Sequence, residues 1–169
     1  MEVLVSCTLM TILAAIAVPR YAQLALQMRT GAVATQILSD IAFARQQSER
    51  TGVIHYIDVS GGTGVNYTVK RSAAPPAIQP STDPVVRSSQ LGTRMPGVSF
   101  STNGVTADPY GGTVSGATPA TRMSFNARGL PNNAGSYFVA SSDGQRAYAI
   151  SVTGAGRVRL FMRSGGSWR

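Results

Sequence analysis

The first twenty residues constrain the fold of this chain more than any other stretch, because they are apolar and almost free of charge. Glu2 heads the run, no charged residue interrupts positions 3–19, and Pro19 and Arg20 close it. As a helix rising 1.5 Å per residue, positions 3–19 would be roughly 26 Å long, slightly short of a hydrocarbon core of about 30 Å. The run predicts a membrane helix, and a carboxylate at its edge is a candidate functional group.

A signal peptide and a buried core helix are the simpler interpretations of this run. A signal peptide begins with basic residues and ends at a cleavage site of small residues. Here the order is reversed: the acid Glu2 comes first and Arg20 comes last. No such cleavage site is followed by a plausible new start, and the helical pattern continues beyond Pro19.

An amphipathic pattern follows the apolar run. Apolar residues recur at intervals of three to five, at Tyr21, Leu24, Met28, Val33, Ile37, Leu38 and Ile41. Their polar counterparts are Arg29, Gln36, Asp40 and Arg45. A basic last turn before Gly52 is typical of a helix C-terminus. We therefore expect one long helix, kinked at Pro19.

Beyond Gly52 the hydrophobic period changes from 3.6 to 2, which is typical of strands. Residues 53–59 and 65–70 predict a hairpin around a turn at 61–64. Four prolines in residues 72–84 predict a loop, and residues 101–120 predict an exposed excursion. Further strands are expected at 85–86 and 98–100, and an antiparallel meander at 122–125, 136–140, 147–152 and 157–161.

These patterns predict an α+β fold, in which a long N-terminal helix packs on, and projects from, an antiparallel β-sheet domain. The expected segments are a transmembrane part (residues 1–20), an amphipathic part (residues 21–52) and a β-rich globular domain (residues 53–169).

Catalytic chemistry has little support in the sequence. The single histidine, His55, lies in an expected strand, where a structural role is the common one. Histidines and cysteines show no metal-ligand spacing, and the few acids form no close pair for acid–base catalysis. Residues 61–64 lack the Lys-Ser/Thr of a phosphate-binding loop. We expect a protein that is not an enzyme and uses no metal or cofactor. Cys7, the one cysteine, excludes a disulfide within the chain.

The formal net charge of +8 is concentrated at the C-terminal end. Residues 121–169 hold seven arginines against Asp143 alone, whereas the rest of the chain is nearly balanced. A basic balance confined to the last third points to a polyanionic partner. A generically basic, solvated surface is the alternative.

The N-terminal residues resemble the first helix of type IV pilins and type II secretion pseudopilins. Glu2 aligns with the glutamate of that family's mature N-terminus, and Pro19 with its proline at the same spacing. The resemblance implies that Glu2 meets the N-terminal ammonium of a neighbouring subunit, so that two charges neutralise each other in an apolar bundle and fix the axial register. It also implies partners: other pilins or pseudopilins in a helical filament, and the inner membrane before assembly, with the globular domain in the periplasm.

In that family a leader, a cleavage glycine and an N-terminal aromatic residue precede the glutamate. This chain begins at the residue directly before Glu2. We therefore expect either a start codon assigned too far downstream or a truncated chain, because a prepilin peptidase could not process these residues as they stand. An in-frame basic leader ending in Gly-Phe-Ser/Thr-Leu upstream of Met1 would establish the class.

Three further elements narrow the resemblance to the FimT/FimU and GspH branch of minor pilins. They are Ala44-Arg45 with Gly52 eight residues after the alanine, Phe125-Asn126-Ala127-Arg128-Gly129, and Gly156-Arg157-Val158-Arg159. The resemblance covers the helix and the final third of the chain, and it is weak over residues 71–120. In the FimT-like branch the last element is associated with DNA binding during natural transformation.

Arg157 and Arg159 alternate on an expected strand, so both side chains would project from one face about 7 Å apart, close to the spacing of successive phosphates. Val158 and Leu160 would then face the core. The candidate DNA-binding residues are Arg157, Arg159, Arg163, Arg128 and Arg146, and double-stranded DNA is the candidate partner. The alternative is a GspH-like pseudopilin that contacts other pseudopilins or exported proteins without binding DNA.

Overall fold

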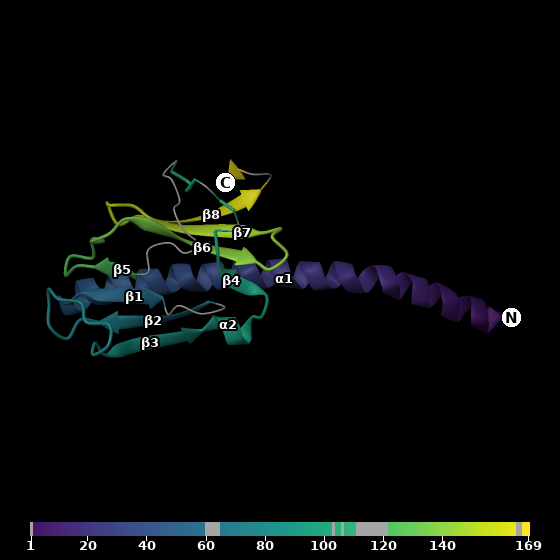
Figure 1. Cartoon of the computed structure of the whole chain (residues 1–169), viewed down its shortest axis with the longest axis horizontal. Coiled ribbons are helices and arrows are strands. Elements are labelled where there is room, and N and C mark those ends of the chain that lie inside the picture. The colour runs from purple at the N-terminus through teal and green to yellow at the C-terminus, as the bar shows by residue number, and fades with distance from the viewer. Residues whose placement is uncertain (1, 60–64, 103, 106, 111–121, 165–166) are drawn as a thin grey trace.

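One continuous helix, α1 (Glu2–Thr51), forms the axis of the molecule in this computed structural model. The structure describes residues 2–59, 65–102, 104–105, 107–110, 122–164 and 167–169. The helix continues through Pro19 without interruption. Its N-terminal part projects from the domain with a gradual bend, and its C-terminal part lies between two sheets (Figure 1). The expected division at residue 20 stays a prediction, since a single helix spans both parts.

The end of α1 agrees with the sequence. Gly52 has a φ of 68°, a left-handed conformation that glycine adopts at little cost. Its N–H donates to the Ser48 carbonyl at 3.0 Å, which satisfies one of the last helical carbonyls. The predicted C-cap at Gly52 is confirmed.

The face of α1 that packs against the sheets differs from the apolar face that the amphipathic pattern predicts. Tyr21, Leu24 and Met28 are exposed, with 75%, 50% and 66% of their surface accessible. The first fully buried residue is Thr30, and the buried apolar face of the helix consists of Val33, Ala34, Ile37, Ile41 and Ala44. The expectation of one apolar face from Tyr21 onward is therefore corrected, because at about 100° per residue Tyr21, Leu24 and Met28 lie on the opposite side of the helix from this buried face. Leu26, on the buried side, packs against the core.

The first sheet has the strand order β3-β2-β1-β5 and is antiparallel throughout. The strands are β1 (His55–Val59), β2 (Asn66–Arg71), β3 (Val85–Gln90) and β5 (Arg122–Phe125). The predicted hairpin of β1 and β2 is confirmed, with Ile57 opposite Val69. The predicted turn at 61–64 lies outside the described residues.

The second sheet has the strand order β4-β6-β7-β8-β9. Its strands are β4 (Val98–Phe100), β6 (Gly135–Ser141), β7 (Ala147–Val152), β8 (Val158–Ser164) and β9 (Ser167–Trp168). A short helix, α2 (Leu91–Arg94), connects β3 to β4. Neither α2 nor β9 was expected from the sequence, because both are too short to show a periodic pattern.

The predicted C-terminal meander is correct for β6, β7 and β8 and wrong for β5. Residues 122–125 pair with β1 in the first sheet, where Met123 lies opposite Ile57. The segment after β5 crosses to the second sheet, so the domain has two sheets around α1 instead of one. Met123 and Phe125 are fully buried in the core that both sheets share with the helix.

The loop of residues 72–84 forms around a buried carboxylate. Asp83 accepts hydrogen bonds from the Tyr56 hydroxyl at 2.9 Å and from the backbone N–H groups of Ala73 and Gln79 at 2.8 Å each. Burial alone would raise the pKa of Asp83, but these hydrogen bonds stabilise the ionised form and hold the pKa below its ordinary value. Lys70 also donates to the Pro80 carbonyl at 2.7 Å, so β2 anchors the loop.

The beginning of the 101–120 excursion is packed, which corrects the expectation that it is exposed. Val105 is buried against Phe138 and Ala149, on the face of the second sheet that points away from α1. The Trp168 indole N–H donates to the Ala107 carbonyl at 3.0 Å, and this bond ties the segment to β9. Residues 111–121 of the excursion lie outside the described residues.

Candidate functional site

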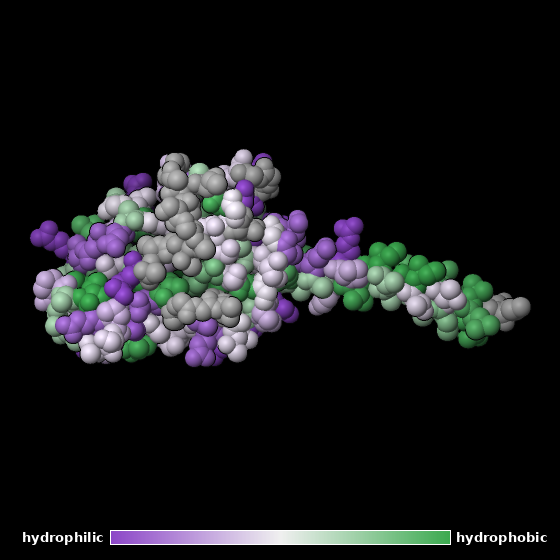
Figure 2. All heavy atoms as spheres, in the orientation of Figure 1, coloured by the Kyte–Doolittle hydropathy of each residue, from purple (hydrophilic) through white to green (hydrophobic). Residues whose placement is uncertain are grey.

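The projecting part of α1 is an apolar surface that this chain does not cover. Val3, Met10 and Ile16 have 76%, 72% and 62% of their surface accessible, and hydrophobic side chains line this part of the helix (Figure 2). Among the described residues, α1 is the one helix whose length and composition would allow it to cross a membrane. An apolar surface of this extent marks contact with lipid or with protein.

The polar side chains in this apolar surface are satisfied within the helix. The hydroxyl of Thr8 donates to the Leu4 carbonyl at 2.8 Å, and that of Thr11 to the Cys7 carbonyl at 2.7 Å. These bonds back to the preceding turn remove the penalty of an unpaired hydroxyl in an apolar medium. The helix can therefore be buried over its N-terminal part without a polar partner for either threonine.

The two predicted assembly residues lie on this part of the helix. Glu2 is its first residue, and Pro19 lies inside it, in the exposed stretch that ends at Leu24. Both lie well before the buried face of α1 that begins at Thr30. Their contacts with a neighbouring subunit stay a prediction.

Arg157 directly precedes β8, Arg159 is the second residue of that strand, and both are exposed. Val158 and Leu160 alternate with them and pack against the core, as the sequence predicted. Arg159 lies opposite Ser151 of β7, on the sheet face that points away from α1. The alternation of the two arginines with core residues is therefore confirmed, whereas DNA contact is not tested by it.

An aromatic residue divides this outer face of β8. Phe161 follows Arg159 on the same face, and the Tyr110 ring packs edge-on against it with centroids 5.6 Å apart. Arg163, next on that face, is half-buried and lies opposite Ala147 and Trp168. The packed segment around Tyr110 thus separates Arg163 from the pair Arg157 and Arg159.

Arg128 and Arg146 lie at opposite ends of the second sheet. Arg128 is exposed in the turn after β5. Arg146 is half-buried and donates to Gln27 of α1 at 3.3 Å and to the Met162 sulfur at 3.0 Å. Arg146 therefore lies on the helix side of the sheet, whereas the outer face carries Arg159.

The three sequence elements that carried the resemblance meet at one junction. Arg45 of α1 donates through Nη1 to the Gly156 carbonyl at 2.7 Å and through Nε to Glu49 at 3.1 Å. Gly129 adjoins the same helical turn, because a Cβ there would overlap the Glu49 carboxyl group. A Cβ on Gly156 would lie 3.6 Å from the Gly129 carbonyl oxygen. The junction therefore fixes Gly156, the residue before Arg157, to the C-terminal part of α1.

The turn that contains Arg128 is held by Asn126. Its Oδ1 accepts from the backbone N–H groups of Arg128 at 2.9 Å and Leu130 at 3.1 Å. Gly129 has a φ of 69° and donates to the Asn126 carbonyl. This element thus has a structural explanation: the asparagine closes the turn, and the left-handed φ and the close approach of Glu49 both favour glycine at position 129.

Asp40 is a functional candidate that the sequence analysis placed on the polar side of the helix. It is fully buried, which corrects that expectation. Its carboxylate forms an ion pair with Arg87 at 2.8 Å and accepts from the Tyr67 hydroxyl at 2.7 Å and the Gln36 amide at 3.2 Å. A signal was present, because Asp40 follows Val33 by seven residues and so falls on the buried stripe of α1.

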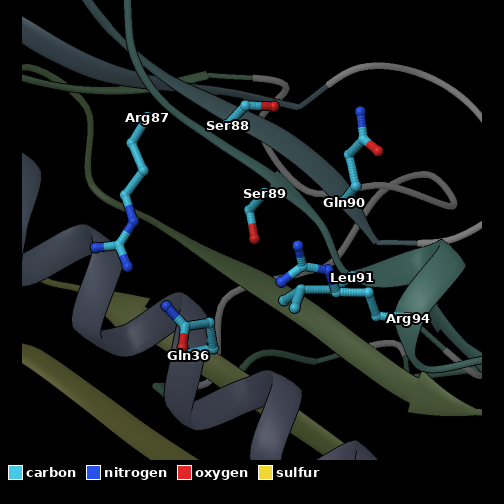
Figure 3. Close-up of a pocket in the computed structure, with 7 residues that line it drawn as sticks. All are labelled: Gln36, Arg87, Ser88, Ser89, Gln90, Leu91 and Arg94. Atoms are coloured by element: carbon cyan, nitrogen blue, oxygen red, sulfur yellow. The ribbon is translucent and has the colours of Figure 1, made fainter.

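A polar pocket of about 380 Å³ lies beside this cluster (Figure 3). It is formed by α1, by the C-terminal half of β3 and by α2. Its lining consists of Gln36, Arg87, Ser88, Ser89, Gln90, Leu91 and Arg94. No sequence pattern indicated it, because its residues come from three separate elements.

The fold and these surfaces together define the class of the protein. A helix with an exposed apolar first part, whose second part packs against antiparallel sheets, is a pilin-like arrangement. The fold is similar to the crystal structure of the type IV minor pilin FimU from Pseudomonas aeruginosa PAO1. The TM-score is 0.53 at 14% sequence identity, over 82% of this chain and 91% of that chain.

The family comes from the sequence match. The family described as Type II transport protein GspH matches residues 33–156, well over half of the chain, and the chain belongs to this family. No curated protein matches the sequence. The predicted FimT/FimU/GspH-like pilin family and the predicted α+β fold are thus confirmed. The matched span includes the Arg45 and Gly129 junction, whereas Glu2, Pro19 and Arg157 lie outside it.

Proposed function

We propose that this protein is a minor pilin or pseudopilin, a structural subunit of the helical filament of a type IV pilus or a type II secretion pseudopilus. The carrying observation is the continuity of α1, whose first part is apolar and exposed while its second part is the centre of the domain. Lipid tails and neighbouring apolar helices are both suitable surroundings for such a surface. Before assembly the helix spans the inner membrane once, with the domain in the periplasm.

Glu2 and Pro19 are the proposed assembly residues. Glu2 pairs with the N-terminal ammonium of a neighbouring subunit, which offsets the cost of both charges in the filament core. Glu2→Ala should insert into membranes like the wild type and be depleted from sheared filaments. Glu2→Asp keeps the charge and should recover part of the incorporation, and Gln23→Ala serves as the control on the exposed part of the helix. Wild-type amounts of Glu2→Ala in filaments would refute this role.

Beyond the role as a filament subunit, we propose that the protein binds double-stranded DNA through its basic C-terminal strand. Its support is the exposure of Arg128, Arg157 and Arg159 near the junction, on a chain whose positive charge is concentrated in the last third. Arg163 would extend contact to the far end of β8, and Arg146 is the least suited because of its bonds on the helix side. Exposed guanidinium groups favour phosphate contact, with little sequence preference.

Gel shifts of the full chain in detergent micelles test this proposal. Arg157→Gln/Arg159→Gln should weaken binding and lower the slope of log affinity against log salt by about one unit per lost phosphate contact. The control Arg50→Gln/Arg71→Gln removes the same charge from other exposed positions. Equal loss in both double variants would assign the binding to net charge alone.

The alternative is a pseudopilin of type II secretion that contacts other pseudopilins or exported proteins without binding DNA. The family description, a type II transport protein, favours it. Wild-type protein that shifts no DNA at low salt would favour this alternative. Genes for a secretin and a secretion ATPase beside this gene would support it, whereas pilus and competence genes would support DNA uptake.

A further inference from the structure

The pocket between α1, β3 and α2 carries a positive charge that none of the described residues neutralises. Arg87 forms its ion pair with the buried Asp40 and lies over the Phe43 ring, with 5.6 Å from its guanidinium carbon to the ring centroid. The Arg94 side chain is exposed and forms no hydrogen bond or ion pair with any residue that the structure describes. The pocket therefore has a net charge of about +1, which comes from Arg94.

The remaining lining suits a single oxyanion. The guanidinium groups of Arg87 and Arg94 lie on opposite sides of the pocket, with Ser89 and the Gln36 amide between them (Figure 3). Leu91 is buried and forms an apolar floor under this end of β3. Ser89 already forms a hydrogen bond with Tyr67, and the Gln36 amide donates to Asp40. The Arg94 guanidinium is therefore the donor left for a ligand, and its charge matches a carboxylate.

The pocket lies at the end of an open sheet edge. β3 pairs with β2 on one side, and no strand among the described elements pairs with its other side. Val85 and Val86 are 53% and 44% exposed on it. Edge strands usually carry proline, lysine, a bulge or a cover that blocks further pairing. β3, with the sequence VVRSSQ, contains neither proline nor lysine, and the register shift at Val86 leaves Arg87–Gln90 as its regular part. Its free backbone groups can accept another strand.

We propose that β3 and this pocket bind an extended segment of a partner protein that carries an acidic side chain. The segment adds to the sheet as a strand beside β3, and its carboxylate enters the pocket and pairs with Arg94. A peptide fits both features, since a free phosphate or a nucleic acid would use the arginines but leave the backbone edge unpaired. This surface is separate from the apolar helix and from Arg157, so it would act whether or not the filament and DNA proposals hold.

The test titrates full-length protein in detergent micelles with two synthetic peptides, acetyl-TVTVTE-amide and acetyl-TVTVTQ-amide, followed by NMR. The acidic peptide should shift the backbone amides of Ser88 and Gln90 and the Arg94 Nε–H signal together. The glutamine peptide should bind about ten-fold more weakly, the loss expected for one charge-assisted hydrogen bond. Arg94→Gln should weaken the acidic peptide by a similar factor, whereas Arg50→Gln should leave its affinity unchanged.

Three outcomes would overturn the proposal. The first is equal affinity for both peptides, which would remove the carboxylate from recognition. The second is an Arg94 shift without any shift along β3, together with equal binding of free citrate, which would make the pocket a site for small anions. The third is an effect of Arg50→Gln as large as that of Arg94→Gln, which would reduce the binding to general attraction.

Discussion

Asp40 shows how a single charged side chain can be stable inside the core of this domain. Its carboxylate is fully buried, and three side chains from α1, β2 and β3 donate to it or pair with it. Tyr67 and Arg87 lie 27 and 47 positions after Asp40 in the chain. The helix pattern could indicate the burial of Asp40 but not these partners. The cluster fixes the position of the helix relative to the first sheet.

Removing this carboxylate should destabilise the domain. Asp40→Ala leaves the buried Tyr67 hydroxyl without its acceptor, and we expect a loss of about 2–4 kcal/mol, below that of a fully buried pair because Arg87 is half-exposed. Tyr67→Phe keeps the Arg87 pair and should cost about 1 kcal/mol. Urea unfolding of the full chain in micelles measures both. A loss under 0.5 kcal/mol for Asp40→Ala, on the order of an ordinary surface change, would contradict this.

Three glycines form a matched series for the junction. Gly129→Ala meets both a φ of 69° and the Glu49 carboxyl group, and we expect a loss of about 2–4 kcal/mol. Gly52→Ala has the unfavourable φ of 68° but open space, and should cost about 1 kcal/mol. Gly154→Ala has neither, so its midpoint in urea should match the wild type. Adding Glu49→Ala to Gly129→Ala should recover the steric part, and no recovery would argue against the overlap.

His55 should make the stability depend on pH. It is buried, with Nδ1 2.9 Å from the Val53 carbonyl, and burial, with Arg71 nearby, lowers its pKa below the usual 6.5. Below about pH 6.5 the unfolded chain binds a proton that the folded chain resists, so the free energy of unfolding falls as pH decreases. His55→Gln should remove this step between pH 7.5 and 5.5, measured by urea midpoints. An unchanged step in His55→Gln would assign it elsewhere, although not to Asp83, whose lowered pKa acts only at more acidic pH.

At the scale of elements, the sequence predicts the helix α1 more accurately than it predicts which residues of α1 are buried. Tyr21, Leu24 and Met28 lie on the side of α1 opposite the buried stripe, at about 100° per residue, and are exposed. Leu26, which does continue the stripe, is partly buried against the core. The sequence predicts the helix and its C-cap correctly, since both depend on local patterns. It cannot predict where the cover over the helix begins, because that depends on where the strands end in space.

A charge in the projecting part of α1 should prevent membrane insertion. Ile12→Arg places a guanidinium group in the middle of the apolar run, at a cost of about 2.5–3.5 kcal/mol or roughly 100-fold in partition. Gln23→Arg adds the same charge in the polar stretch beyond Pro19 and should insert normally. The fraction that resists carbonate extraction from membranes measures this. Equal extraction of both variants would mean that the run does not lie in the membrane.

Strand pairing shows a similar limit. Each predicted strand from residue 53 onward has a counterpart, since alternation is a local signal, but the assignment of β5 to the C-terminal meander is wrong. Its partner β1 lies 66 residues earlier, as the register of Ile57 with Met123 shows. Likewise, the alternation of Arg157 and Arg159 with core residues was predictable. The separation of Arg163 by Tyr110, and the bonds of Arg146 to the helix side, depend on long-range contacts.

At the scale of the whole molecule, one half of α1 is covered by the two sheets and the other half is uncovered. The second half of α1 forms the centre of the core with both sheets. The same continuous helix also forms the projecting part of the molecule (Figure 1). The uncovered half favours apolar surroundings, and the proposed function supplies them from a membrane for a single subunit and from other helices in a filament. The proposed filament assembly rests on this arrangement, whereas membership of the GspH family rests on the sequence match over residues 33–156.

Cys7 offers the most direct test of the proposal that the uncovered half of α1 becomes filament core. It is the only cysteine and is exposed on the isolated helix, so a maleimide reports on this position alone. We expect the protein to be present in sheared surface filaments, with Cys7 unreactive toward a polar maleimide until the filaments are denatured. Filaments that lack the protein, or filaments in which Cys7 reacts as fast as in denatured protein, would contradict the account.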